Sequence, residues 1–157
     1  MTKLFFDESV ILMEVKGETK EAVLEEMGNN LVQKGLVKDS FVEAVIAREK
    51  EFATGLPTAG VAVAIPHTDV EHVNTKTISV GILKKPVAFG IMGEEEEMVN
   101  VELVFMLAMN ETHSQLALLQ KLMEIFQNEE TLKYLMKETD ATRIKETIEQ
   151  QIDFTTL

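Results

Sequence analysis

The stretch Val99–Phe126, VNVELVFMLAMNETHSQLALLQKLMEIF, changes its apolar period part-way along. Up to Leu107 apolar side chains fall at every second position, which is the period of a β-strand with one buried face. Beyond Thr112 the spacing becomes helical, and Thr112 with Gln115 has the pattern of a capping box. The predicted apolar face of this helix is Leu116, Leu119, Leu122, Met123 and Phe126. The stretch therefore predicts a strand that leads directly into a helix.

The same patterns on either side predict further strands and helices. Apolar runs predict strands at Val10–Val15, Val61–Ile65 and Thr77–Leu83. A first helix is predicted to begin at Thr19 and to end at Gly35. A second begins at a capping box formed by Ser40 and Glu43, and its predicted inner face is Val42, Val45, Ile46 and Phe52. Two more helices are predicted at Leu132–Met136 and Asp140–Ile152. Ala53–Gly60 and the acidic run Glu94–Glu97 are expected to be loops. Because strands and helices are interleaved, we expect an α/β fold, with residues 1–157 forming a single domain.

Composition excludes several classes of function. The chain has 15 Lys+Arg against 27 Asp+Glu, a formal net charge of −12, and this disfavours binding to nucleic acid or to anionic membrane surfaces. No apolar run approaches the roughly 20 residues needed to cross a bilayer, and Asp7 and Glu8 interrupt any signal peptide. There is no cysteine, so disulfides, thiolate nucleophiles and cysteine-based metal sites are excluded, and a reducing cytoplasm is consistent with this.

Two segments lie where α/β sheets usually carry their sites, just past the carboxyl ends of strands: Pro66–Thr68 and Asn110–His113. Pro66 restricts its own φ angle and the geometry of Ile65, so His67 stands on a stiff support. The Walker, G-x-S-x-G, G-x-G-x-x-G and H-E-x-x-H motifs are all absent. A neutral histidine ring is therefore the strongest candidate nucleophile. Position alone, however, is equally compatible with His67 being a loop residue that has no functional role.

His113 and Arg48 are the other candidates. His113 is expected to be the first residue inside the helix capped by Thr112, where the positive helix end disfavours an imidazolium and attracts anions. There a neutral ring could donate an N–H to a phosphate or a carboxylate. Arg48, near the end of the second helix, could serve an anion as a bidentate donor. Taken alone, each residue is more simply an exposed member of a helix end.

A metal site at His67 and His72, with Asp69 and Glu71 between them, is not favoured. The i, i+5 spacing of the two histidines belongs to no standard ligand motif, and carboxylates are common in loops.

The stretch Arg48–His67, REKEFATGLPTAGVAVAIPH, resembles the phosphorylation-site region of the IIA components of the bacterial phosphoenolpyruvate-dependent sugar phosphotransferase system. It is similar to the fructose/mannitol superfamily, and most of all to its galactitol branch. The matching elements are Arg48-Glu49, Thr54-Gly55 and Ala64-Ile65-Pro66-His67. Asn110–Leu122, NETHSQLALLQKL, resembles a later segment of the family that places a histidine beside the site. The resemblance extends from the first strand to about Leu135.

The resemblance implies a mixed, mostly parallel sheet flanked by helices on both faces. It also implies that His67 accepts a phosphoryl group at Nε2 from the phosphocarrier HPr and passes it to a IIB component in the cytoplasm, with no cofactor. His113 maps onto the family's neighbouring histidine and Arg48 onto its site arginine. The other ring nitrogen of His67 is expected to donate to a carbonyl or a carboxylate, which fixes the tautomer.

Two features depart from many relatives. The loop between Arg48 and Pro66 is longer than in mannitol-type members, as in the galactitol branch, and Thr68 stands where many relatives have Gly or Cys. These departures leave the sugar open. Two alternatives to sugar transport also stay open: a regulatory phosphoprotein of the same fold, of the nitrogen type or attached to a regulator, that acts by binding other proteins, and a small binding module without phosphoryl chemistry.

Overall fold

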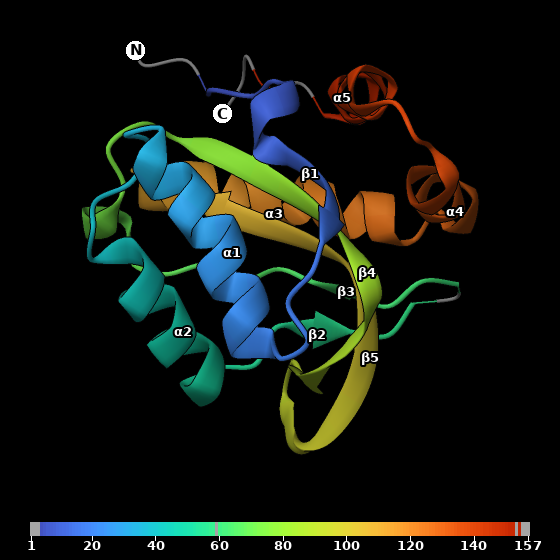
Figure 1. Cartoon of the computed structure of the whole chain (residues 1–157), viewed down its shortest axis with the longest axis horizontal. Coiled ribbons are helices and arrows are strands. Elements are labelled where there is room, and N and C mark those ends of the chain that lie inside the picture. The colour runs from blue at the N-terminus through green and yellow to red at the C-terminus, as the bar shows by residue number, and fades with distance from the viewer. Residues whose placement is uncertain (1–3, 59, 153, 155–157) are drawn as a thin grey trace.

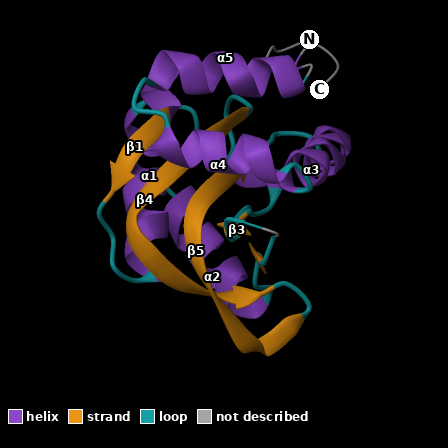
Figure 2. Cartoon of the chain, turned by 90° about the vertical axis from the view of Figure 1, so that its right-hand side faces the viewer, coloured by secondary structure: helices purple, strands orange, loops and turns teal. Residues whose placement is uncertain are grey.

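A five-stranded mixed sheet forms the centre of the molecule, and helices lie on both of its sides (Figures 1 and 2). The computed structural model describes residues 4–152, except residue 59, and residue 154. The strands are β1 Ile11–Val15, β2 Gly55–Leu56, β3 Val63–Ala64, β4 Thr77–Ile91 and β5 Glu94–Ala108. The helices are α1 Lys20–Gln33, α2 Phe41–Glu51, α3 Thr112–Phe126, α4 Glu129–Lys137 and α5 Ala141–Gln151, with short 3-10 helices η1 Glu8–Val10 and η2 Val70–His72.

The sheet has the order β1-β4-β2-β3-β5, and β4 also pairs directly with β5. The pairs β1–β4, β2–β4 and β3–β5 are parallel, whereas β2–β3 and β4–β5 are antiparallel. The expected mixed sheet, with helices on both faces, is therefore confirmed. Its longest pairing is the antiparallel hairpin of β4 and β5, which runs from Thr77 opposite Ala108 to Ile91 opposite Glu94.

The prediction that the acidic run Glu94–Glu97 is a loop was wrong, because these residues form the start of strand β5. Strand β4 continues to Ile91, and Gly93 takes a φ of 80° at the turn, so the residues after the turn pair back onto β4. Glu94, Glu96 and Glu97 are exposed. The backbone of this segment pairs with β4, whose own end also pairs with β2 at Gly55, while the exposed carboxylates stay in water.

Helices α1 and α2 cover the face of the sheet that is turned toward the viewer in Figure 1, and α3 lies behind it. Thr19 caps α1 by accepting from the Ala22 N–H, and Gly35 follows the helix with a φ of 72°, so both predicted ends of this helix are confirmed. Met27 of α1 packs onto Gly81 of β4, where a Cβ would come within 2.7 Å of the Met27 sulfur. The missing side chain lets the helix lie close to the sheet.

Other local predictions were wrong. Residues Gly55–Leu56, expected within a loop, form β2. Phe52 is 53% exposed because it follows the last residue of α2 in an extended conformation, where helical spacing no longer applies, whereas Phe41 at the start of α2 is buried. Leu116 is 58% exposed, since the buried face of α3 is instead Ser114, Leu118, Leu122, Ile125 and Phe126. Neither predicted capping box forms: Glu111, not Thr112, precedes α3, and Ser40 makes no capping bond.

Candidate active site

The strands that precede the two candidate segments run in parallel, so both segments leave the sheet at the same edge. Val63 of β3 lies opposite Leu103 of β5, and Ala64 lies opposite Val104. The pairing extends beyond β3, because the Leu107 N–H donates to the Pro66 carbonyl over 3.0 Å. His67 therefore emerges beside the last residues of β5, a few residues before the start of α3.

His67 is held in one tautomer by its own backbone. Its Nδ1 lies 2.9 Å from the Ile65 carbonyl oxygen, which can only accept, so Nδ1 carries the proton and Nε2 keeps its lone pair. Burial lowers the pKa of His67 below its usual range; the Ile65 hydrogen bond opposes that shift and the nearby Arg48 charge adds to it. The lowered pKa favours a ring that is neutral at physiological pH, with a free lone pair on Nε2.

Arg48 lies within electrostatic reach of His67, since its charge contributes to the lowered pKa of that ring. The guanidinium stands 5.0 Å above the centre of the Phe52 ring, and its Nη1 lies 3.9 Å from a carboxylate oxygen of Asp69. The side chain is 37% exposed. The structure thus brings an arginine near the end of α2 to the loop that carries His67.

A buried carboxylate connects Arg48 to the histidine strand. Glu49 is 3% exposed and accepts hydrogen bonds from the Thr54 N–H at 2.8 Å and the Thr54 hydroxyl at 2.7 Å. The Thr54 carbonyl in turn accepts from the N–H of Ile65, the residue whose own carbonyl holds His67. Burial raises the pKa of Glu49, and its two bonds to Thr54 oppose that shift. This chain of contacts positions α2 relative to His67.

Sequence reasoning assigned no role to Glu49 or Thr54, although both stood in the motif. The signal was a Glu next to the candidate arginine followed five residues later by Thr-Gly. Gly55 itself has no room for a side chain, since a Cβ would meet the Gly90 carbonyl oxygen at 2.5 Å.

His113 is the second residue of α3 rather than its first, and it is exposed. It stands at the sheet edge from which His67 emerges, because only a short connection separates β5 from α3. Nearby, the Asn110 Oδ1 and the Gln115 Oε1 are buried without a hydrogen-bond partner. The start of α3 therefore offers polar groups as well as backbone N–H groups beside the strand ends.

His72 has a structural position of its own. Its Nδ1 lies 2.8 Å from the Ser40 hydroxyl, and its carbonyl accepts from the Lys38 N–H. These contacts join the connection between α1 and α2 to η2. Within the part of the chain that the structure describes, no group of three or more His, Cys, Asp or Glu side chains is placed to hold a metal ion.

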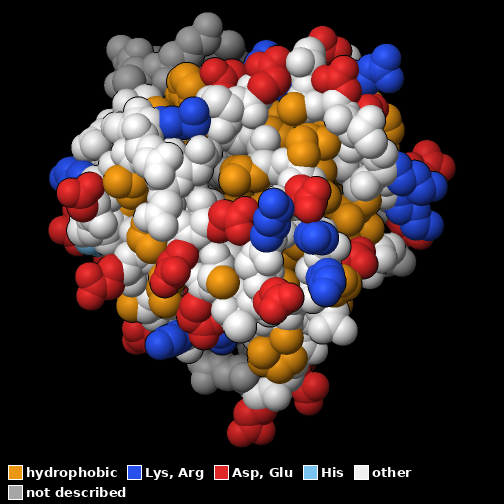
Figure 3. Space-filling view, viewed as in Figure 1, with side chains coloured by type: hydrophobic (Ala, Val, Ile, Leu, Met, Phe, Trp, Pro, Cys, Tyr) orange, Lys and Arg blue, Asp and Glu red, His pale blue; other side chains and the backbone are white. Residues whose placement is uncertain are grey.

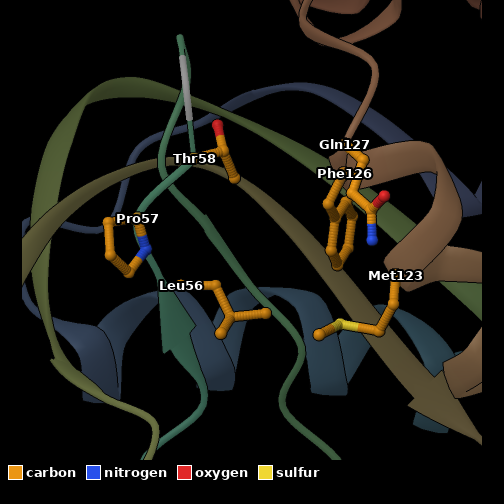
Figure 4. Close-up of a pocket in the computed structure, with 6 residues that line it drawn as sticks. All are labelled: Leu56, Pro57, Thr58, Met123, Phe126 and Gln127. Carbon is orange, nitrogen blue, oxygen red and sulfur yellow. The ribbon is translucent and has the colours of Figure 1, made fainter.

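A separate pocket of about 340 Å³ lies at the other end of α3 (Figure 4). Leu56, Pro57 and Thr58 line one side, and Met123, Phe126 and Gln127 line the other. With a rise of about 1.5 Å per residue, α3 separates this pocket from His113 by most of its length. The pocket is therefore distinct from the candidate site. None of the described helices is long and apolar enough to span a bilayer.

The fold and the site together define a class of protein, and comparison with known sequences identifies it. Residues 4–151 match the family described as "Phosphoenolpyruvate-dependent sugar phosphotransferase system, EIIA 2". The chain therefore belongs to this family of phosphotransferase components. It is 31% identical over 146 residues to the galactitol-specific EIIA component of Escherichia coli K12, a match that covers 93% of each chain.

Solved structures agree in fold. Mannitol IIA from Escherichia coli has a TM-score of 0.72 and 25% identity, covering 92% of this chain and 99% of that one. The nitrogen regulatory protein IIA-Ntr from Neisseria meningitidis has a TM-score of 0.72 and 26% identity, covering 90% of this chain and 94% of that one. A third neighbour, with a TM-score of 0.72 and 23% identity, is IIA mannitol in complex with phosphorylated IIB mannitol of Escherichia coli.

Proposed function

We propose that this EIIA component carries a phosphoryl group on His67, taking it from phospho-HPr and passing it to the IIB component of a galactitol-type sugar or polyol system in the cytoplasm. The observation that carries the proposal is the state of the His67 ring. Burial keeps the ring neutral, the Ile65 carbonyl holds the proton on Nδ1, and Nε2 is left with a lone pair. A phosphoryl carrier needs that arrangement.

The transfer needs no proton, oxidant or metal to balance. The Nε2 lone pair of His67 attacks phosphorus as the nitrogen–phosphorus bond of the donor histidine breaks, and that bond's electron pair returns to the donor ring. The Nδ1–H of His67 stays on the Ile65 carbonyl throughout and stabilises the positive charge that the ring gains. When the group passes to IIB, a nucleophilic atom of IIB forms the new bond to phosphorus, the Nε2–phosphorus bond of His67 breaks, and its electron pair returns to Nε2.

The bonds that the phosphoryl group makes to the two histidine nitrogens are similar in energy. The protein therefore acts mainly by positioning the group and neutralising its oxygens. Arg48 supplies a positive charge near His67, and His113 with the first N–H groups of α3 supplies donors from the adjacent strand end. The hydrogen bonds between Glu49 and Thr54 hold α2, and therefore Arg48, in a fixed position relative to the loop that carries His67.

Exposed apolar side chains beside these residues support a docking role. Phe52 lies under the Arg48 guanidinium, and Leu116 stands one turn beyond His113 on α3. Both partners must reach the same Nε2 atom, so HPr and IIB bind one surface in turn. A IIA mannitol neighbour solved with its phosphorylated IIB supports a IIB partner for this fold.

Sugar transport is favoured over a purely regulatory role because the galactitol-specific relatives match 93% of this chain at 31% identity. The longer loop between Arg48 and Pro66 supports the galactitol class in particular.

The test is phosphorylation by enzyme I, HPr and phosphoenolpyruvate, followed by intact-mass measurement. We expect one acid-labile phosphoryl group on the wild-type chain, none on His67→Ala, and one on the control His72→Ala. Stoichiometric labelling of His67→Ala would overturn the assignment. Delivery of the group to a galactitol-type IIB then separates a transport role from a regulatory one.

A further inference from the structure

Asp69 follows the proposed acceptor by two residues, and its carboxylate faces the site arginine. Its Oδ1 lies 3.9 Å from Arg48 Nη1, and the two side chains are 71% and 37% exposed. Both charges act on the His67 ring in opposite senses, because Asp69 raises its pKa and Arg48 lowers it. The two charges therefore have opposing effects on the pKa of His67.

The Asp69 side chain has no visible task in holding the loop together. Asp69 precedes η2, yet its carboxylate makes no capping hydrogen bond, and only its backbone carbonyl accepts from the His72 N–H. An ion pair this exposed contributes little to folding stability. Replacing the carboxylate by an amide of the same shape is therefore compatible with an intact loop.

We propose that Asp69 competes with the phosphoryl group for Arg48 and so keeps phospho-His67 ready to give the group up. This inference rests on the proposed function of His67. Before transfer, Arg48 is paired with Asp69. A phosphoryl group on Nε2 brings close to two negative charges, so it draws the guanidinium toward itself and repels the carboxylate. In the phosphorylated state Arg48 interacts with the phosphoryl oxygens only after its ion pair with Asp69 has been broken.

The consequence is a less stable phosphorylated state than an uncontested arginine would produce. An exposed pair of this kind changes an equilibrium constant by a factor of roughly 1.5 to 5. Repulsion between Asp69 and the phosphoryl oxygens acts in the same direction, and salt screens both effects over about 8 Å at physiological ionic strength. A carrier that holds its group less tightly passes it on faster.

The test measures the equilibrium constant for phosphoryl exchange between HPr and this chain, approached from both directions to a common plateau. We expect Asp69→Asn to raise the constant in favour of phospho-His67 about two- to five-fold, and to slow the return of the group to HPr by a similar factor. The matched control is Glu71→Gln, which removes one negative charge of similar exposure, 74%, two residues further on. We expect the control to stay within a factor of about 1.5 of the wild type.

Whether Asp69 acts through Arg48 is read from a double-mutant cycle. In an Arg48→Gln background the effect of Asp69→Asn should shrink toward that of the control. An undiminished effect there, no effect in the wild-type background, or an equal effect of Glu71→Gln would overturn the inference. If Arg48→Gln cannot be phosphorylated, the salt series decides: the effect of Asp69→Asn should fall as salt rises, and a constant effect refutes competition between charges.

Failure of this inference is distinguishable from failure of the proposed function. A wild-type chain that takes no phosphoryl group, or a His67→Ala variant that does, removes the proposed function. A wild-type chain that is labelled at His67 and exchanges with HPr no differently from Asp69→Asn removes only the role of Asp69.

Discussion

Replacing Thr54 by Val isolates one hydrogen bond of the buried Glu49 carboxylate. Valine has the shape of threonine, so the substitution leaves no cavity, and the backbone N–H of residue 54 still donates to Glu49 Oε2 over 2.8 Å. The bond that disappears is the 2.7 Å contact from the Thr54 hydroxyl to Glu49 Oε1. Glu49 is only 3% exposed, so water cannot readily replace the lost donor.

The expected loss of stability follows from that contact. A hydrogen bond to a charged group contributes about 1.5–3 kcal/mol, so we expect the free energy of unfolding to fall by about 2 kcal/mol near neutral pH. For a chain of this size that corresponds to a decrease in Tm of roughly 4–8 °C. Because Thr54 also connects Glu49 to Ile65, the rate of phosphoryl transfer should fall as well.

The pH dependence separates this cause from a loss of packing. Burial already raises the folded-state pKa of Glu49 above its unfolded value, so the contribution of this group is full below the unfolded pKa and is lost as pH rises toward the folded one. The Thr54 hydroxyl lowers that folded pKa, and removing it raises the pKa further. The stability deficit of Thr54→Val should therefore be smaller at about pH 5 than at about pH 7.5.

Urea unfolding of both proteins at the two pH values measures this difference. Thr139→Val, an exposed threonine, is the control and should change stability by less than about 0.5 kcal/mol. A Thr54→Val variant as stable as that control, or one with the same deficit at both pH values, would refute the reasoning.

Three further predictions concern the proposed transfer. His113→Ala should slow phosphorylation by HPr at least about tenfold with an unchanged Tm, because the side chain is exposed; a large fall in Tm would count against a role in the site. Because burial lowers the pKa of His67, the pH at which the rate of labelling falls to half should lie below the ordinary histidine pKa of about 6.5; a half-point above that pH would contradict a neutral, buried nucleophile. With a net charge of −12 and acidic side chains spread over the face shown in Figure 3, added salt should lower the second-order rate constant with HPr and leave the rate at saturating HPr unchanged; stopped-flow constants that are flat in salt would exclude electrostatic steering.

Elements with a strong local period were predicted well. Ile144, Ile148 and Ile152, spaced four apart, are all buried, and α5 spans Ala141–Gln151 within the predicted range. Helix α1 begins after Thr19 and ends before Gly35 as expected. In these segments propensity, capping and burial agree, so each stretch carries enough information about its own structure.

Elements that depend on distant partners were not predicted. Strand β2 has two residues and no strand pattern, and it exists because Gly55 pairs with Ala64 on one side and Ile91 on the other. Ser40 carried a capping pattern, but its hydroxyl lies against His72, 32 residues away. The pairing of β2 and the hydrogen-bond partner of Ser40 depend on which groups the fold brings together. A local sequence pattern does not contain that information.

The candidate site divides in the same way. The resemblance of the residues around His67 to a known motif predicted a site that also includes Arg48 and His113, whereas residue types and strand ends alone left each of these residues open to a position outside any site. The electrostatic state of His67 was not readable from the sequence, because it depends on burial, on the Ile65 carbonyl and on the charge of Arg48. A local pattern specifies which side chains are available at a strand end. The pKa values and ion pairs of these side chains come from desolvation and from contacts across the chain, and these exist only after it folds.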